Sequence, residues 1–401
     1  MLKHIVIKEI QEHIKGYKFN IVFISCIVLL GFNQLVMYQN YDSKLSDSNL
    51  KFPSSEEQPI QKVADPLSIY VTGTSELLDR VFKYDKNSST LVELHILNID
   101  IFRQYFPLID YNYLIRVILS FLAMVVGFDA FCGEKQQGTL KLILSNSVKR
   151  STLIWGKILG NFLILILPLI FTSLLYYIIL SFKTNIHFTP SDNIRLLLMM
   201  LISIIYLSIF LIISIAVSAS STTVTVSIIK NFIIWVFLIF IISNPFSLLF
   251  NSNEYKLPDG RSIVDKYFIN RIENSRDTTR LVAQEKAFFD YVSDVLNYRN
   301  KLKKQIRMIE LSSLVIPSDA FNLCITSLAR CGLQDENNFR MAILQYHKER
   351  HDGEKDSGFN YKGIGLASSI NSCLKYFISL ILLMLTVLLV AINKFNHYDI
   401  R

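Results

Sequence analysis

Long apolar runs separated by polar segments dominate the pattern of this 401-residue chain. Six of the runs are long enough to cross about 30 Å of hydrocarbon as helices of about 20 residues. They cover residues 19–38, 111–131, 158–181, 194–218, 229–250 and 372–393. The pattern therefore predicts an all-α polytopic membrane protein with six transmembrane helices.

The segment 1–18, which precedes the first run, is amphipathic. Its apolar residues fall four apart, at Leu2, Val6, Ile10 and Ile14. Charged and amide side chains take the other side, which suits a helix lying in the membrane interface. The run 19–38 is too long for a signal peptide and has no small-residue cleavage pattern, so we expect it to remain as the first span.

Basic residues in the short segments predict the orientation. Most lie before the first span, after the second, or beside the fifth and sixth: Lys3, Lys8, Lys15, Lys18, Lys135, Lys141, Lys149, Arg150, Lys157, Lys230 and Lys394. The third-to-fourth connection carries only Lys183. Because cytoplasmic loops are enriched in Lys and Arg, we expect both termini to be cytoplasmic. The richness in Lys, Ile and Asn is typical of an AT-rich bacterial genome, so we expect the membrane to be a bacterial inner membrane. The segment 132–157 and the tail 394–401 then face the cytoplasm, and the polar regions 39–110 and 251–371 face outward.

The formal net charge of +8 needs no nucleic-acid partner, since the inner membrane rim explains much of the basic excess. The rim also carries Asp129, Glu134 and Lys157, which can pair with one another or with a partner protein. Arg116 lies within the second span near its outer end. It can snorkel to the lipid headgroups or contact a substrate, and both readings stay open.

The region 251–371 predicts a mainly helical outer domain. A near-heptad series predicts one long amphipathic helix, through Leu281, Phe288, Val292, Val295, Leu302, Ile306 and Ile309. Its seam can pack within the chain or against a second copy. Ser318 can cap a second helix that runs to about Arg330 and stops at Gly332, and a third runs from Asn338 to about His351. In the region 39–110, residues 92–97 fit either a strand or the rim of a helix.

Other candidate chemistry is sparse. His347 and His351 have a spacing that can chelate a metal, but they also fit a charged, solvated helix end, and we predict neither a metal nor a cofactor. On one helix, Cys324 and Cys331 are too far apart for a disulfide. A bridge between Cys331 and Cys373 stays open. The chain has no phosphate loop and no hydrolase or metalloprotease motif, so we expect it not to be an enzyme.

The segment between the second and third spans carries an ordered motif. It reads Glu134-Lys135-Gln136-Gln137-Gly138-Thr139-Leu140, then Leu144, Arg150 and Gly156-Lys157. This resembles the E-x-x-x-G-T-L…L…R…G-K signature of ABC-2 type transporter permeases, which lies at the same place in that family. The residues, their order and their predicted cytoplasmic position all agree.

Further motifs resemble the subgroup of these permeases with enlarged extracytoplasmic regions, including the gliding-motility and copper-maturation permeases. They are Asp65-Pro66-Leu67-Ser68-Ile69 with Gly73, Ile316-Pro317-Ser318-Asp319-Ala320-Phe321, and Tyr398-Asp399-Ile400-Arg401. The chain departs from the subgroup pattern at Ile316, which stands where a serine is usual, and at Val148, where a proline is frequent.

The resemblance implies a half-transporter that pairs with a second copy or a paralogue and docks two copies of a separate ABC ATPase. By the family pattern, the ATPase-coupling residues are Glu134, Gly138, Thr139, Leu140, Lys149 and Arg150. Gly138 can also be a plain turn residue, and Lys149 and Arg150 can equally be positive-inside anchors.

The leading interpretation is therefore an ATP-driven export permease in contact with membrane lipid. An alternative keeps the ATPase but has no translocated substrate, so that the complex transmits mechanical work to an extracytoplasmic partner. A secondary transporter is a weaker third reading, because the spans lack buried acidic relays and an inverted repeat.

Overall fold

The computed structural model describes residues 2–49, 65–73, 80–85, 90–95, 109–145, 149–242, 280–351, 359, 361 and 363–396. The chain forms two compact units. One comprises Met1–Trp235 together with Ala320–Arg401, and the other comprises Val236–Asp319.

Within the described residues, six helical segments are long and apolar enough to cross a membrane, as the sequence predicts. They are Lys18–Ser46, Tyr111–Gln136, Arg150–Ser181, Pro190–Ser220, Val224–Ile241 and Leu366–Phe395. Most extend beyond the apolar runs, because helical hydrogen bonding continues past the hydrocarbon. The predicted fifth span, 229–250, begins earlier in the structure, so that Lys230 lies within it; residues 243–250 are outside the described residues.

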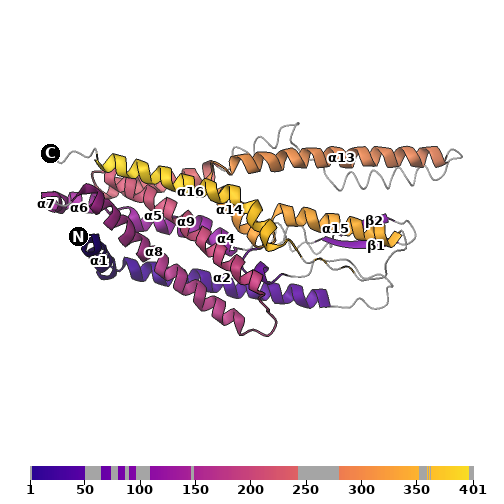
Figure 1. Ribbon diagram of the computed structural model, residues 1–401, viewed down its shortest axis with the longest axis horizontal. Coiled ribbons are helices and arrows are strands. Elements are labelled where there is room, and N and C mark those ends of the chain that lie inside the picture. Colours follow the sequence, from indigo (N-terminus) through magenta and orange to yellow (C-terminus); the bar gives the residue numbers. More distant parts are fainter. Residues whose placement is uncertain are drawn as a thin grey trace. The chain divides into compact units, whose positions relative to one another are not determined.

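The spans are built from the following helices (Figure 1). They are α2 (Lys18–Asn49); α4 (Tyr111–Tyr113), the π-helical η2 (Leu114–Leu119), α5 (Ser120–Gly127) and α6 (Cys132–Gln136); α8 (Arg150–Ser181); α9 (Pro190–Ser220); α10 (Val224–Val236) with the π-helical η3 (Phe237–Ile241); and α16 (Leu366–Asn396). Local signals define α9 well, because it begins with proline in its first turn and with a capping box between Thr189 and Asp192.

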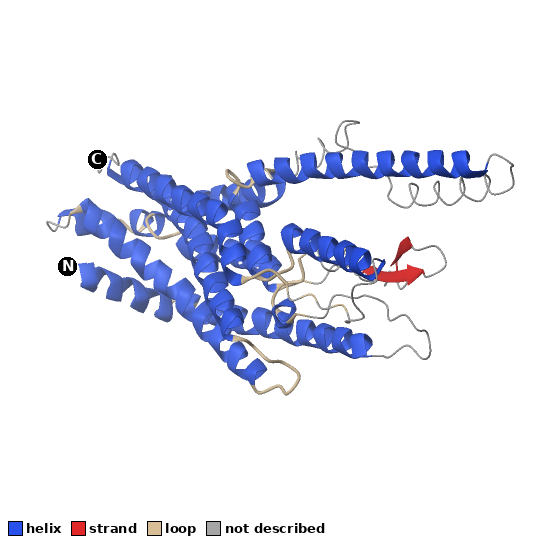
Figure 2. Cartoon of the chain, turned by 45° about the vertical axis from the view of Figure 1, so that its right-hand side comes forward, coloured by secondary structure: helices blue, strands red, loops and turns tan. Residues whose placement is uncertain are grey.

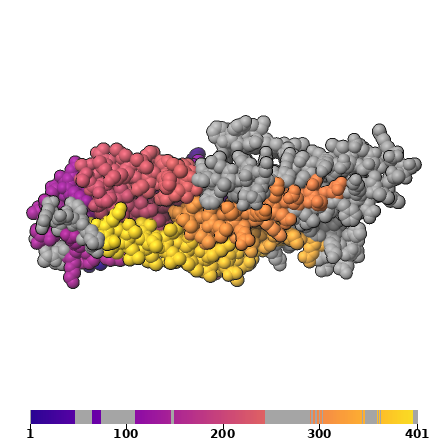
Figure 3. Space-filling model, turned by 90° about the horizontal axis from the view of Figure 1, so that it is seen from above, coloured from indigo at the N-terminus to yellow at the C-terminus, as the bar shows by residue number. Residues whose placement is uncertain are grey.

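The second and fourth spans form the core of the first unit, and α9 packs against both α5 and α16. In their most apolar windows these spans are 61% and 56% buried, against 17% for the fifth and 22% for the sixth. The fifth and sixth spans therefore present broad apolar surfaces, including Phe232, Ile233, Leu382 and Leu389. The surfaces of α10 and of α16 (yellow) lie open on the face seen in Figure 3. Such surfaces suit contact with lipid or with another span.

The first polar region contains a short 3-10 helix and a β-hairpin. The 3-10 helix η1 (Pro66–Ile69) is capped by the Asp65 side chain. Strands β1 (Arg80–Asp85) and β2 (Thr90–His95) pair antiparallel, with Arg80 opposite His95 and Asp85 opposite Thr90 (Figure 2). The part of 92–97 that the structure describes is therefore a strand, and the mainly helical fold carries one hairpin.

The second polar region contains α13 (Arg280–Ser312), α14 (Pro317–Leu328) and α15 (Leu333–His351). The single long helix predicted from the heptad series is confirmed. Ser318 is not a cap, because α14 already begins at Pro317, and α15 begins five residues before the predicted Asn338.

The end of α14 also differs from the prediction. Arg330, and not Gly332, takes the left-handed conformation, with φ 55°. The Cys331 N–H donates to the Thr326 carbonyl at 3.1 Å, which completes a Schellman-type helix end. A non-glycine residue tolerates this backbone here because two carboxylates hold its side chain, as described below.

All five cysteines are buried free thiols, so a bridge between Cys331 and Cys373 is not formed. The closer neighbour of Cys373 is Cys324, whose thiol donates to the Cys373 carbonyl at 3.5 Å. Cys331 lies against Gly73, where an added Cβ would come within 2.6 Å of the Cys331 sulfur.

Candidate functional site

The motif segment leaves the second span as two short helices joined by a tight turn. The helix α6 ends at Gln136, and α7 (Thr139–Ser145) follows it. Gly138 between them has φ 73°, in the left-handed region that glycine adopts without steric cost. No atom lies within 4 Å of a Cβ added there, so the backbone conformation, and not crowding, accounts for the glycine.

The N-terminal helix α1 (Leu2–Lys15) packs along the start of α8. α1 and the start of α8 lie near the end of the bundle that also holds α6 and the C-terminal end of α16 (Figure 1). Glycines on α8 allow the close approach. A Cβ at Gly156 would lie 2.5 Å from Ile5 Cγ2, and one at Gly160 would lie 2.6 Å from Glu9 Cβ. The glycine of the G-K pair thus makes room for α1.

The face that α1 buries is not the predicted apolar stripe. Glu9 and His13 are buried, whereas Ile7 and Ile14 are 41% and 48% exposed. The reason is that α8 presents buried polar groups, Lys157 and Asn161, toward α1. The exposed apolar residues remain available to a membrane interface.

Lys157, the second residue of the G-K pair, lies at the centre of a buried ion cluster. Its Nζ is 2.8 Å from Glu9 Oε1 and 3.1 Å from Glu134 Oε2, and it lies over the Phe131 ring. The Lys8 Nζ reaches Glu134 Oε1 at 3.1 Å. Glu134 therefore joins α6 to both α1 and α8. We call Lys8, Glu9, Glu134 and Lys157 the lysine cluster.

The protonation of this cluster depends on its depth. Burial raises the pKa of the Glu9 carboxyl, although Lys157 opposes the shift. Burial disfavours the charged form of Lys8, but the Glu134 and Glu12 carboxylates together outweigh that effect and raise the pKa of the Lys8 ammonium. Lys157 therefore favours the ionised form of Glu9 against the effect of burial.

Two further contacts fasten the motif segment to other spans. Lys18, at the start of α2, forms an ion pair with Asp129. Lys135 donates to the Ala219 carbonyl and, at 3.2 Å, to the Ser221 carbonyl, where α9 ends. A cation at a helix C-terminus is favourable because the last carbonyls lack helical partners. The segment is therefore tied to the third and fourth spans, and Asp129, just before it, ties the second span to the first.

The structure separates the predicted coupling residues into two groups. Glu134 and Leu140 point into their own chain, and Leu140 is only 2% exposed. Thr139 donates to the Glu134 carbonyl at 3.3 Å. Gly138 is exposed, as are Lys149, which precedes α8, and the neighbouring Gln136, Gln137, Lys141 and Leu142; Arg150 is partly exposed. Leu142, at 66%, is the most exposed apolar residue of α7.

Sequence reasoning anticipated the pairing of Glu134 with Lys157 but missed Lys8 and Glu9. A signal was present, because Ile5, Glu9 and His13 are four residues apart and share one helical face. The metal alternative cannot be followed to its ligands, since the side chains of His347 and His351 lie outside what the structure describes.

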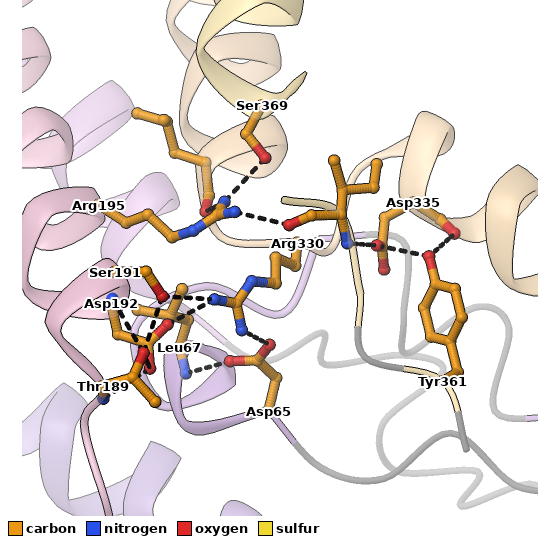
Figure 4. Close-up of polar contacts among 12 residues, drawn as sticks. Asp65, Leu67, Thr189, Ser191, Asp192, Arg195, Arg330, Asp335, Tyr361 and Ser369 are labelled. Atoms are coloured by element: carbon orange, nitrogen blue, oxygen red, sulfur yellow. Dashed lines mark hydrogen bonds and ion pairs between the residues drawn. The ribbon is translucent and has the colours of Figure 1, made fainter. Parts of the chain in front are cut away.

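The opposite end of the first unit holds a second charged network, which we call the arginine knot (Figure 4). It comprises Asp65, Asp192, Arg195, Arg330 and Asp335. Arg330 donates to Asp65 Oδ2 at 2.8 Å and to Asp192 Oδ1 at 2.6 Å. Asp65 precedes η1 and Asp192 lies in the first turn of α9. Arg330 therefore joins the end of α14 to two distant segments.

The other arginine of the knot is fully buried. Arg195 donates to the carbonyls of Leu328 and Ile364, at 2.8 and 2.6 Å, and to Ser369 Oγ at 2.8 Å. Asp335 of α15 also binds the segment that precedes α16, because it accepts from the Ile364 N–H at 3.1 Å. The fourth and sixth spans are thus bound to α14 and α15.

These features define a multi-pass membrane subunit whose motif segment is braced by a buried ion cluster, with no candidate catalytic centre among the described residues. A family profile for ABC-2 family transporter proteins matches residues 4–400, and the chain belongs to that family. It is a membrane permease component, and the family implies a partner ATPase subunit and typically a dimeric assembly. A search of curated proteins finds no match to the chain.

Proposed function

We propose that the chain couples ATP hydrolysis by a separate nucleotide-binding subunit to export of a substrate across a bacterial inner membrane. Its N- and C-termini and the motif segment face the cytoplasm in this proposal. The observation that carries it is the contrast within residues 134–145. The exposed tip of the segment is free to dock, while its base is tied to the third and fourth spans.

The ATPase binds the exposed tip. Leu142 is the apolar anchor, and Lys141 with the glutamines before Gly138 forms a polar rim. Lys149 and Arg150 add a basic edge where α8 begins. The other motif residues, Glu134, Thr139 and Leu140, hold the tip in position. This division follows the general anatomy of interfaces, in which an apolar centre is surrounded by polar contacts.

Closure of two ATPase subunits moves the tip as a rigid element. Glu134 transmits that displacement to α1 and α8 through Lys8 and Lys157, and Lys135 transmits it to the end of α9. Such rigid-body rotation of helices is a common way to couple nucleotide state to conformation. The spans of this chain then move between two positions relative to the spans of a second copy or a paralogue.

The test is to purify the tagged chain from native membranes and to measure the co-purifying ATPase and its hydrolysis rate. Leu142→Asp should lose the ATPase by at least about tenfold, since it buries a charge in the contact. Phe182→Asp is the matched control, because Phe182 is 84% exposed in the connection between α8 and α9. Equal recovery of the ATPase with both variants would refute the docking site.

The orientation has its own test. Ser293 on α13 and Ser145 on α7 are both exposed, and all five native cysteines are buried. A cysteine at Ser293 should react with a membrane-impermeant maleimide on intact cells, and one at Ser145 only after permeabilisation. The reverse pattern would invert the topology.

A second function, mechanical transmission to an extracytoplasmic partner, is favoured by the arginine knot. Arg195 and Phe321 connect α9 to α14, since the Phe321 ring stacks on Tyr206 with centroids 4.4 Å apart. A stiff connection of this kind would transmit a movement of α9 to α14 and so to the extracytoplasmic side. A photoreactive residue at position 293 should capture a protein partner if this function holds, and no protein if the chain only exports a solute.

A further inference from the structure

The second span contains a π-helical stretch, η2 (Leu114–Leu119), with Arg116 inside it. A π-helical turn widens the backbone and displaces one carbonyl from the regular helical pattern, and such turns are frequent at functional sites. Arg116 is also an ionisable residue within a membrane span, where a charge is costly and usually has a role. The coupling mechanism uses neither feature.

Three spans hold the backbone of Arg116. Its carbonyl accepts from Ser120 Oγ at 2.7 Å and from the Tyr206 hydroxyl at 2.9 Å. The Trp235 Nε1 of α10 donates to Ser120 Oγ at 3.0 Å. The second, fourth and fifth spans therefore meet at the Arg116 carbonyl, which the Ser120 and Tyr206 hydroxyls hold in place.

The side chain of Arg116, by contrast, has no partner among the described residues. It is partly exposed. Among the residues that the structure describes, no carboxylate lies within ion-pair distance of it and no group accepts a hydrogen bond from its guanidinium. Five N–H donors in a planar fork are thus left for a ligand.

Asp110 is the acidic group that Arg116 influences, but its oxygens are already occupied. Oδ1 accepts from the Tyr113 N–H at 2.8 Å, and Oδ2 accepts from the Thr72 N–H at 3.2 Å. Burial raises the pKa of Asp110, while these N–H groups and the Arg116 charge oppose the shift. Asp110 serves as the N-cap of α4 and is not free to neutralise Arg116.

The depth of Arg116 limits its alternatives. It follows the cap Asp110 by six residues, or about 9 Å of helix rise. Long side chains on a helix generally lean toward its N-terminal end, which for Arg116 is the Asp110 end of the span. The guanidinium therefore lies near the level where lipid phosphates and dissolved anions meet the hydrocarbon.

We propose that Arg116 forms a binding site for an anionic phosphate group. A guanidinium recognises phosphate through two parallel charge-assisted hydrogen bonds. The phosphate belongs either to an anionic phospholipid headgroup or to a free phosphate-bearing solute. Binding at this site needs no ATPase, so it can be tested independently of the proposed coupling mechanism.

Trp235 provides a reporter, because the chain has only two tryptophans and Trp155→Phe leaves Trp235 alone. In this background, the purified chain is reconstituted with phosphatidylcholine and either brominated phosphatidylglycerol or brominated phosphatidylcholine. Quenching of Trp235 gives the relative affinity for the anionic lipid. Inorganic phosphate is then titrated into samples without brominated lipid.

We expect Trp235 to report a preference for phosphatidylglycerol of roughly tenfold, as a charged hydrogen bond supplies. Arg116→Gln should abolish the preference, whereas Arg116→Lys should keep part of it. Lys183→Gln removes an exposed charge beside α8 and should change nothing. A response to inorganic phosphate that Arg116→Gln removes would identify a free anion as the ligand. Equal quenching by both lipids without a phosphate response, or a preference that survives in Arg116→Gln, would overturn the proposal.

Discussion

The lysine cluster and the arginine knot lie at opposite ends of the first unit, on different helices, and use different cations. Lys157 meets two glutamates as a compact point charge, and Lys8 shares one of them. Arg195 and Arg330 spread planar forks over fixed carbonyls and aspartates. A lysine ammonium can exchange carboxylate partners by rotating its stem, whereas an arginine fork fits one geometry.

The difference between the two networks indicates which end of the first unit can move. The lysine cluster joins α1, α6 and α8 by side chains alone. A small displacement of these helices therefore lets each lysine exchange one glutamate partner for another. The arginine knot binds side chains to backbone, as at Leu328 and Ile364, and a displacement there breaks hydrogen bonds outright. We infer that the end with the lysine cluster is adjustable and that the end with the arginine knot is rigid. The following predictions test that contrast.

The largest effect is expected from removing the central charge of the lysine cluster. Lys157→Met leaves Glu9 and Glu134 buried near each other without their shared cation, which should cost about 3–5 kcal/mol of stability. The measurement is thermal unfolding of the purified chain, with Lys149→Met as the exposed control. Adding Glu9→Gln should recover part of the loss. A double variant as unstable as the single one would show that charge is not the cause.

A smaller loss of stability is expected from replacing the planar Arg195 guanidinium of the knot by another positively charged group. Arg195→Lys cannot reach all three acceptors and should cost roughly 2–3 kcal/mol. Thermal unfolding measures this loss, and Arg150→Lys, at a partly exposed position, is the control. If Arg195→Lys were neutral, the knot would be as adaptable as the lysine cluster and the contrast would fail.

A third prediction concerns the helix contact beside the lysine cluster. Gly156→Ala places a Cβ 2.5 Å from Ile5 and should displace α1 at a cost of about 1–3 kcal/mol. Trypsin should then cleave after Lys15 or Lys18 faster than in the wild type. The control is Gly133→Ala, where the nearest atom would be at 3.8 Å. Unchanged cleavage would mean that α1 is not held by this contact.

The smallest effect concerns pH. Burial, aided by Lys18, lowers the pKa of His13 below its usual value of 6.5, while Asp129 and Asn161 oppose the shift. The unfolded chain then binds a proton more readily, so His13 should reduce stability as pH falls through 6.5. Unfolding measured from pH 8 to 5 should become less pH-dependent in His13→Gln.

The spans were predictable because their signal is local. A run of about 20 apolar residues defines a span without reference to any other segment, as for 111–131. The turn at Gly138 and the pairing of Glu134 with Lys157 were also accessible, since both lie within the family motif. The hairpin residue pattern at 92–97 was ambiguous because short apolar runs fit either structure.

The remaining features depend on contacts between distant segments. Arg330 adopts a left-handed backbone because Asp65 and Asp192, far away in sequence, hold its side chain. Likewise, α1 buries Glu9 because Lys157 faces it across a glycine-lined contact. The spacing of Ile5, Glu9 and His13 indicates a shared helical face but not the partner of that face, and so the knot and half of the lysine cluster were not predicted.

The most direct test of the account is photo-crosslinking in intact cells from a photoreactive residue at position 142. We predict a covalent adduct with a nucleotide-binding protein from position 142 and none from position 182, at the opposite end of α8. An adduct with such a protein from position 182 alone would contradict the coupling site. So would crosslinking from position 142 that captures only lipid.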